Sequence, residues 1–292
     1  RRLTFGHIKP LTAALTALVL DPADIARLQR TAETLHAVIE KVIDFTLATP
    51  ERRCRFFPDH DRIFPFLAPT RGCPTWQVVS RYDVAVTPDG QLKLMELNTG
   101  CPGGFMIAEA MSDVARHGFA ELRAFQTTTC QWTENATIRP AALIDSLLDL
   151  EASAGIETDA IGLLNDENDL VFELDLVADA LRRQGRPVIL ADAAILRHET
   201  GIRSRKGALI HDNQVLSLVY NKFRISTPRS RNHCWRDGFE DRYAAFLAAQ
   251  KNGDVVSINN LVGMLLAEDK SLLAFLREPD VRAELTPDEI RL

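Results

Sequence analysis

The sequence predicts an α/β protein, in which an α+β first part precedes a second part built on a parallel sheet. A long amphipathic helix and a β-hairpin occupy the first part, whereas from about residue 155 short apolar strands alternate with an amphipathic helix. The composition fits a globular chain, since 46% of the 292 residues are hydrophobic and 25% are charged. A net charge of -6 disfavours a non-specific polyanion binder, so we expect no nucleic-acid partner.

Membrane and extracellular functions are also disfavoured. No apolar run reaches the roughly 20 residues that a membrane-spanning helix needs, so we expect no membrane partner. The chain contains 5 cysteines without a CxxC pair, a pattern that argues against a zinc site or a disulfide framework. We therefore expect a cytoplasmic protein, because thiols stay reduced in that compartment.

The first predicted element is a long helix that begins after Asp21. Asp21 is a typical N-cap, Pro22 suits the first helical position, and Asp24 complements the positive end of the helix dipole. Apolar residues then recur at steps of three and four, at Ile25, Leu28, Ala32, Leu35, Ile39 and Val42. The pattern predicts a packing helix that ends before Pro50.

A β-hairpin is predicted after an irregular segment. Residues 52–75 are rich in Pro, Phe and Arg, which is typical of connecting structure. Residues 78–86 and 92–98 alternate around Pro88-Asp89-Gly90, which indicates two strands joined by a turn. A tight loop over residues 101–104 and a helix over about residues 106–125 should follow.

The second part begins after about residue 153. Residues 160–164 and 187–190 predict two buried strands, and residues 170–183 predict an amphipathic helix between them that ends at Gly185. This spacing favours a parallel sheet with a right-handed crossover. The remaining pattern predicts a hairpin, a helix, a strand and a further helix over residues 208–220, 237–250, 254–258 and 269–275. The polar segment 278–292 is either a disordered tail or the start of a part that continues in a longer parent chain.

Four polar residues of the hairpin form the most informative pattern. Residues two apart on a strand share a face, so Arg81 and Asp83 should lie together. The same holds for Glu96 and Asn98. With an even number of turn residues, Asp83 would lie opposite Glu96, and directly opposed Cβ atoms are about 4.5–5.5 Å apart. Two opposed carboxylates repel one another unless positive charge lies between them, and carboxylate and amide oxygens are ligands that Mg²⁺ prefers.

The turn sequence also allows the opposite arrangement. Residues 87–90 are typical of a type I turn followed by a left-handed glycine, which gives a loop of odd length. That loop would place Asp83 opposite Met95 instead of Glu96, unless a single bulge restored the common face. A solvated polar face without any ligand is the other interpretation of these residues.

The pair Arg81-x-Asp83, the run 93–98 with sequence Lys-Leu-Met-Glu-Leu-Asn, and Pro102-Gly103 lie in this order along the chain. Together they resemble the signature of the glutathionylspermidine synthase family, which belongs to the circularly permuted ATP-grasp amide ligases. The resemblance implies that Arg81 is the catalytic arginine. It further implies that Mg²⁺ is bound with ATP by Asp83, Glu96 and Asn98. The spacer between Asp83 and Glu96 is slightly longer than in the family, which leaves the register open.

The resemblance also implies three parts of the chain. Residues 1–153 would form the metal-binding and catalytic half of a permuted ATP-grasp lobe, with an antiparallel sheet and helices. Residues 154–260 would form a Rossmann-like pre-ATP-grasp domain, and residues 261–292 the start of the ATP-binding lobe. Weaker landmarks of the family are residues 218–223, 255–260 and 269–273. No Lys-Pro followed by a Gly-rich loop occurs after Lys270, so we expect the phosphate-binding lysines in a longer parent chain, beyond Leu292.

The function implied is that of an ATP-dependent carboxylate–amine ligase. ATP would phosphorylate a carboxylate on a small molecule or peptide, and an amine would attack the acyl phosphate to give an amide. Arg81 would stabilise the developing negative charge, because a planar guanidinium can hold two oxygens at once. Two alternatives stay open: a non-catalytic binding or scaffold protein derived from this fold, and an ATP-grasp phosphotransferase.

Overall fold

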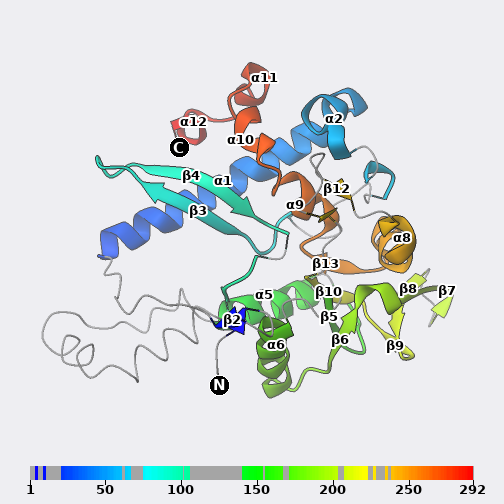
Figure 1. The fold of residues 1–292 in the computed structure, drawn as a ribbon. Helices are drawn as coiled ribbons and strands as arrows, with labels where there is room; N and C mark the ends of the chain where they lie inside the picture. Colours follow the sequence, from blue (N-terminus) through cyan, green and yellow to red (C-terminus); the bar gives the residue numbers. More distant parts are fainter. Residues whose placement is uncertain are drawn as a thin grey trace, which may run out of the picture.

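The computed structural model describes most of the chain, namely residues 4–5, 9–10, 21–60, 63–66, 75–100, 102–105, 140–153, 155–166, 171–202, 207–222, 226–227, 234–235 and 238–291. The long helix and the hairpin lie at one end of the molecule, and the parallel sheet lies at the other (Figure 1). The fold is mixed α/β, as predicted. Cys101 of the predicted loop and the predicted helix over residues 106–125 lie outside the described residues.

Helix α1, Pro22–Leu47, is the predicted long helix. Its N-cap is Asp21, whose carboxylate accepts a hydrogen bond of 2.7 Å from the Asp24 backbone N–H, as predicted. One face of α1 is buried in a core that it shares with the hairpin and with the C-terminal helices, and this face carries Leu35, Val38, Ile39, Val42, Ile43 and Phe45. The same face contains a buried carboxylate, Glu40, which accepts hydrogen bonds from the backbone N–H groups of Trp76 and Gln77 at 2.8 and 3.0 Å.

The prediction of an irregular segment over residues 52–75 is wrong for its first part. Helix α2, Pro50–Phe56, begins directly after α1. Pro50 occupies the first turn of this helix, where its missing N–H costs no hydrogen bond, and the Thr49 hydroxyl accepts from the Arg52 backbone N–H at 3.2 Å. Two short 3₁₀ helices follow, η1 (Pro58–His60) and η2 (Phe64–Phe66).

The hairpin consists of β3, Arg81–Val86, and β4, Leu92–Asn98, as predicted. Its loop has the odd length, because Val86 pairs with Leu92 and the Thr87 N–H donates to the Gln91 carbonyl at 2.9 Å. Gly90 has φ +79°, a left-handed conformation that glycine adopts without strain.

A register shift in the same hairpin restores the common face. Val84 pairs with Leu94, whereas Asp83 pairs with Glu96, so Met95 is an extra residue on β4. The odd loop and the bulge therefore both occur. The loop alone would place Glu96 on the face opposite that of Asp83, and the bulge returns Glu96 to the face of Asp83.

The second part contains a four-stranded parallel sheet in the order β6–β5–β10–β13. These strands are β5 (Ile161–Asn165), β6 (Val188–Asp192), β10 (Leu218–Asn221) and β13 (Val256–Ile258). The β–α–β prediction is confirmed, because helix α6, Val171–Arg183, connects the parallel neighbours β5 and β6.

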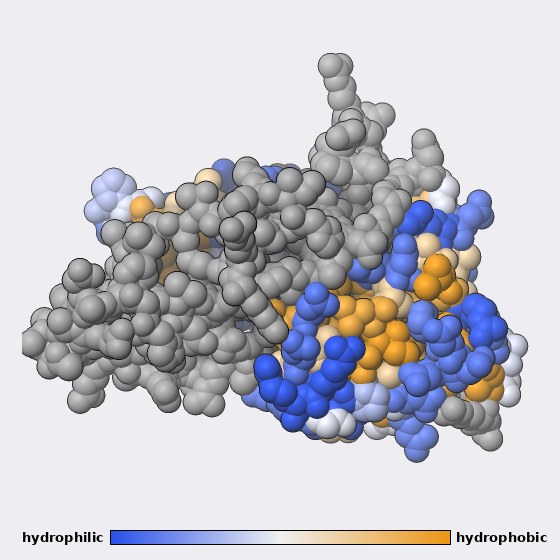
Figure 2. Space-filling view, turned by 60° about the horizontal axis from the view of Figure 1, so that its bottom comes forward, coloured by the Kyte–Doolittle hydropathy of each residue, from blue (hydrophilic) through white to orange (hydrophobic). Residues whose placement is uncertain are grey.

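Helices cover both faces of this sheet. Helix α5, Pro140–Ser153, packs with α6 on one face. The other face contacts α7, Phe239–Arg242, and α8, Ala244–Asn252, which together replace the single predicted helix over 237–250. Seen from this end of the molecule, the described surface is mainly hydrophilic around a smaller hydrophobic area (Figure 2).

Short strands complete the second part. An antiparallel sheet contains β7 (Arg197–Thr200), β8 (Gly207–His211) and β9 (Gln214–Val215). The predicted hairpin at Asp212-Asn213 is present, with positive φ at both residues, but residues 218–220 belong to the parallel sheet instead. Two-residue strands pair as β1 with β2 and as β11 with β12, over Thr4–Phe5, Lys9–Pro10, Ser226–Thr227 and Cys234–Trp235.

The C-terminal residues form short helices, and all but the last of them pack on the core of the first part. These are α9 (Leu261–Leu266), α10 (Ser271–Phe275), α11 (Pro279–Arg282) and α12 (Pro287–Arg291). The expectation of a disordered tail is therefore wrong for residues 278–291. The Lys41 ammonium on α1 holds Glu289 of α12 with hydrogen bonds of 2.8 and 2.9 Å. None of the helices in the described part of the chain is both long and apolar enough to cross a membrane.

Candidate functional site

The face of the hairpin that points away from α1 carries the four predicted residues. Arg81 binds Asp83 through two hydrogen bonds, from Nε to Oδ1 at 2.9 Å and from Nη2 to Oδ2 at 3.1 Å. Asn98, directly opposite Arg81, donates to Asp83 Oδ2 at 3.4 Å. The strand pairing thus brings Arg81, Asp83 and Asn98 into one connected group.

Glu96 lies on the same face but contacts a different partner. Its backbone is directly opposite Asp83, and its Oε1 lies 3.5 Å from the Lys270 ammonium at the start of α10. No sequence pattern identified Lys270 as a neighbour of the hairpin, because the pair is separated by more than half of the chain. Two positive and two negative side chains therefore meet on this face: Arg81, Lys270, Asp83 and Glu96.

These charged groups remain partly in water. The side chains of Asp83 and Glu96 are each 40% exposed, and that of Arg81 is 43% exposed. At such exposure a protein ion pair is worth little in free energy, so an additional ligand can reorganise the pairs at low cost. The site is accessible without opening the fold.

The loop of residues 102–104 contacts Arg81 and holds its guanidinium in place. The Arg81 guanidinium donates from Nη1 to the Gly103 carbonyl at 2.9 Å. The Gly104 N–H donates to Glu173 Oε1 at 2.9 Å, and Gly104 has φ +100°, which only glycine adopts readily. The loop is therefore fixed between the hairpin and the first turn of α6.

A buried ion pair completes this support. The Lys222 ammonium lies 2.6 Å from Glu173 Oε2 and donates to the Pro102 carbonyl at 3.2 Å. The side chain of Lys222 is 0% exposed and that of Glu173 is 4% exposed. Since a buried charge is tolerated only with good partners, this pair holds the loop in one conformation. We refer to Glu173, Lys222 and residues 102–104 as the loop clamp.

A second buried side chain fixes both ends of the hairpin. Asn259 Oδ1 accepts from the backbone N–H groups of Val78 and Val79 at 2.7 and 2.9 Å, just before β3. Its Nδ2 donates to the carbonyls of Val79 and Thr99 at 2.5 and 2.7 Å, the latter just after β4. All of the hydrogen-bonding capacity of this amide is used, so it specifies where the two strands begin and end.

Both supports come from the carboxyl edge of the parallel sheet. Lys222 follows β10 and Asn259 follows β13. The strand order changes direction between β5 and β10, and such a switch point is where open α/β sheets commonly place their ligand sites. The loop clamp therefore places the polar face of the hairpin beside this edge.

The residues of the hairpin have the donor chemistry that Mg²⁺ prefers. Asp83, Glu96 and Asn98 offer carboxylate and amide oxygens, and hard divalent cations choose such ligands and complete their coordination with water or phosphate. The described residues contain no group of three or more His, Cys, Asp or Glu side chains that could hold a metal ion. The hairpin set differs from such a group because its third ligand is an amide.

Neither a protein-family model nor a curated protein matches this chain. The family assignment made from Arg81-x-Asp83 and the run 93–98 thus stays a prediction. The geometry of the hairpin face is an observation that does not depend on this assignment.

Proposed function

We propose that the chain belongs to an ATP-dependent carboxylate–amine ligase of the ATP-grasp type and that the polar face of the hairpin is its metal-binding and catalytic site. One observation carries this proposal: the register shift at Met95 places Glu96 opposite Asp83, on the face that also holds Arg81 and Asn98. The type of reaction rests on the family resemblance. The proposed division at residues 153 and 260 into catalytic half-lobe, Rossmann-like domain and start of the ATP lobe rests on the same resemblance.

Each residue of the face has a distinct proposed role. Asp83, Glu96 and Asn98 would hold Mg²⁺, which when bound neutralises phosphate oxygens. Arg81 would orient and stabilise the carboxylate undergoing phosphorylation, since its guanidinium is already fixed by Asp83 and the Gly103 carbonyl. The substrates would be ATP, a small-molecule or peptide carboxylic acid, and an amine.

A reducing, cytoplasmic location is part of the proposal. Cys54 is an exposed free thiol, and exposed free thiols are typical of compartments in which disulfides do not persist. An acyl-phosphate route from ATP also suits such a compartment, where the nucleotide is abundant.

One observation favours a second candidate, a non-catalytic binding protein. Arg81 engages Asp83 through two hydrogen bonds and Lys270 lies near Glu96, so the charges of the face balance without a metal ion. In that case the face would be a structural salt-bridge network and would not exchange its partners for a metal and a substrate.

Hydroxylamine trapping tests the proposed reaction in the protein. With ATP, Mg²⁺ and a panel of amino acids and short peptides as carboxylate donors, a ligase yields a hydroxamate, because hydroxylamine intercepts the acyl phosphate. Arg81→Lys should lose most of this product, since an ammonium keeps the charge but not the planar fork. Glu96→Ala should abolish it, whereas Glu33→Ala, which alters an exposed residue of α1, should leave it unchanged.

Three results would contradict the ligase. A phosphorylated product that resists hydroxylamine would indicate a phosphotransferase. The absence of any ATP-dependent product across the panel would favour the binding protein. Equal hydroxamate yields from Glu96→Ala and the parent protein would remove the hairpin face from the reaction.

A further inference from the structure

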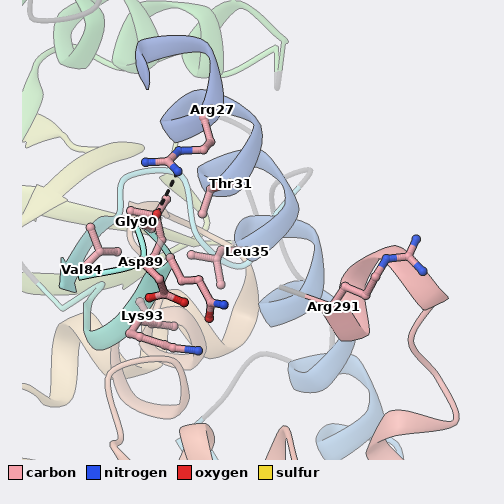
Figure 3. Close-up of a pocket in the computed structure, with 11 residues that line it drawn as sticks. Arg27, Thr31, Leu35, Val84, Asp89, Gly90, Lys93 and Arg291 are labelled. Atoms are coloured by element: carbon pink, nitrogen blue, oxygen red, sulfur yellow. Dashed lines mark hydrogen bonds between the residues drawn. The ribbon is translucent and has the colours of Figure 1, made fainter. Parts of the chain in front are cut away.

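Two parts of the described surface could receive a partner. The first is a pocket of about 410 Å³ between α1 and the tip of the hairpin, where Arg27 Nη1 donates to the Gly90 carbonyl at 2.9 Å (Figure 3). Each cation that lines this pocket lies beside an acid: Arg27 beside Asp24, Lys93 beside Asp89 and Arg291 beside Asp288. The charges of the pocket are therefore balanced and select no ligand. The second part is the outer edge of strand β6, whose backbone groups do select a partner.

Strand β6, Val188–Asp192, forms one edge of the parallel sheet, because β5 is its only partner among the strands that the structure describes. Its first three residues, Val188, Ile189 and Leu190, are apolar, and each remains partly exposed although helices cover both faces of the sheet. The strand contains no proline, lysine or bulge, which are features by which edge strands commonly avoid pairing. This edge can therefore pair with another strand.

The hydrogen bonds with β5 determine which backbone groups of β6 face outward. The Ile161 N–H donates to the Pro187 carbonyl at 3.0 Å, and Ile161 pairs with Val188. Along a parallel ladder, the N–H and C=O groups of every second residue face the same neighbouring strand. The backbone groups of Val188, Leu190 and Asp192 therefore point away from β5 and present donors and acceptors at the edge.

Opposite charges lie at the two ends of the edge. Arg182 Nη2, on α6, donates to the outward carbonyl of Val188 at 3.5 Å and lies only loosely beside Asp179, since the Nη1–Oδ1 distance is 3.9 Å. The Arg182 side chain is 51% exposed, so it can move to a stronger acceptor. Asp192, at the other end of β6, is 30% exposed and lies 3.6 Å from Arg242. The edge thus has a basic end and an acidic end.

An exposed apolar side chain follows the edge strand. Ile195 belongs to the short 3₁₀ helix η4, Ala193–Ile195, which begins directly after β6. Its side chain is 62% exposed, and the other large apolar side chains that are exposed in the described part lie on the hairpin or on α12. Covering apolar surface stabilises a complex by about 25 cal/mol per Å². An interface along β6 would therefore gain from apolar burial as well as from hydrogen bonds.

We propose that two copies of this chain form a two-fold symmetric dimer in which their β6 strands pair antiparallel and join the two sheets into one. Pairing of the whole strand places Leu190 on the two-fold axis and Val188 opposite Asp192 of the second copy. Each outward-facing residue then lies opposite another outward-facing residue, as hydrogen-bonded antiparallel pairs require.

The occupant is a second copy because the edge is complementary to itself. Antiparallel pairing brings the basic end of one strand to the acidic end of the other, so Arg182 can pair with Asp192 of the second copy. Two-fold dimers of this kind use the same surface on both subunits and are the commonest oligomers of soluble proteins. The proposal goes beyond the ligase function and does not depend on it, because none of these residues belongs to the polar face of the hairpin.

Sedimentation velocity and hydrogen exchange of the chain test the proposal. The parent chain should sediment as a dimer, with twice the chain mass of 32.6 kDa, and should dissociate on dilution. Exchange of the backbone N–H groups of residues 188–192, measured by mass spectrometry, should be slower in the dimer than in the dilute monomer. The reason is that strand pairing protects the N–H groups that face outward in the monomer.

Two variants act on different parts of the interface. Leu190→Pro removes an N–H that takes no part in the ladder with β5, and an edge strand tolerates proline at such a position. It should weaken the dimer by about tenfold or more, because the lost N–H lies on the two-fold axis. Ile195→Asp should weaken the dimer by about tenfold, since it places a charge in an apolar contact.

Ile290→Asp is the matched control, because it places the same charge at an exposed isoleucine of α12, and it should dimerise as the parent chain does. Thermal unfolding by circular dichroism confirms that each variant is folded. Ile195→Asp alters an exposed side chain, so it decides the question even if Leu190→Pro fails to fold. The proposal is wrong if the parent chain is monomeric at every concentration, if exchange at residues 188–192 does not slow in the dimer, or if Ile195→Asp dimerises with unchanged affinity.

Discussion

The buried pair of Glu173 and Lys222 fixes the conformation of the loop of residues 102–104 more than it adds to the net stability of the fold. Burying two charges costs free energy that their mutual attraction repays only with good partners, and here the Pro102 carbonyl and the Gly104 N–H supply those partners. Both partners belong to the loop that contacts Arg81. The pair thus connects the parallel-sheet part of the chain to the candidate catalytic arginine.

Lys222→Met should therefore destabilise the protein by about 3–5 kcal/mol, since it leaves the Glu173 carboxylate buried without a counter-charge. The double variant Glu173→Gln/Lys222→Met should recover most of that loss, because the glutamine amide oxygen still accepts from Gly104. Urea unfolding measures both values, with Lys251→Met as the exposed control. A double variant no more stable than the single one would show that the pair is required for folding itself.

Asp269, two residues before α10, contacts His60 of η1, and this contact is sensitive to acid. Partial burial alone would raise the pKa of Asp269, but hydrogen bonds with His60 at 2.9 Å and from Ser271 at 2.7 and 2.8 Å outweigh it and lower the pKa to about 2. A lowered pKa means that the folded state favours the ionised carboxylate. Its contribution to stability is therefore present above about pH 4 and is lost as the pH falls toward about 2.

Asp269→Asn should lower the free energy of unfolding at pH 7 by about 2 kcal/mol, with a smaller difference from the parent chain at acid pH. Urea titrations at pH 7, 4 and 3 measure this difference, and Asp175→Asn, at an exposed residue of α6, is the control. A difference that stays constant from pH 7 to pH 3 would contradict the assigned pKa.

At the scale of the elements, the register shift in the hairpin decides which residues share a face. The odd loop alone would turn Glu96 away from Asp83, and the extra residue Met95 turns it back. Met95 is itself 59% exposed, so its side chain contributes little to the core.

Deletion of Met95 should leave a regular hairpin in which Asp83 still lies opposite Glu96. We expect this variant to fold with equal or higher thermal stability and to keep the properties of the polar face, including any binding of divalent cations. Circular dichroism and a Mn²⁺ titration measure the two properties. Loss of metal binding in a folded deletion variant would contradict this expectation and show that the bulge itself orients the Glu96 side chain toward the metal ion.

At the scale of the whole molecule, the elements were predictable and most contacts between them were not. Asp21, Pro22 and the apolar repeat specify α1, and the strand–helix–strand pattern specifies the parallel sheet, because these signals are local. The contacts of Asn259 with Val79 and Thr99 and of Lys270 with Glu96 join residues far apart in the chain, where periodicity gives no information.

The polar face of the hairpin shows the same limit, because local sequence patterns do not determine which residues of two strands lie opposite one another. The four residues were identified from sequence, but their register depended on whether an odd loop and a bulge occurred together, and turn propensity predicts only the loop. The Pro, Phe and Arg content of residues 52–75 predicts connecting structure, but α2 extends over the first five of these residues, because Pro50 lies in the first turn of that helix. The loop clamp was not predicted because its ion pair joins Glu173 to Lys222 across 49 positions of the chain, a distance over which local patterns give no information.

The proposed function requires that the polar face of the hairpin binds a divalent cation. Electron paramagnetic resonance of the chain titrated with Mn²⁺, a spectroscopic substitute for Mg²⁺, measures this most directly. We expect a single bound ion in the parent chain, at least tenfold weaker binding in Asp83→Asn and in Glu96→Ala, and parent-like binding in Glu33→Ala. Binding that persists unchanged in Glu96→Ala, or no bound Mn²⁺ in the parent chain, would contradict it.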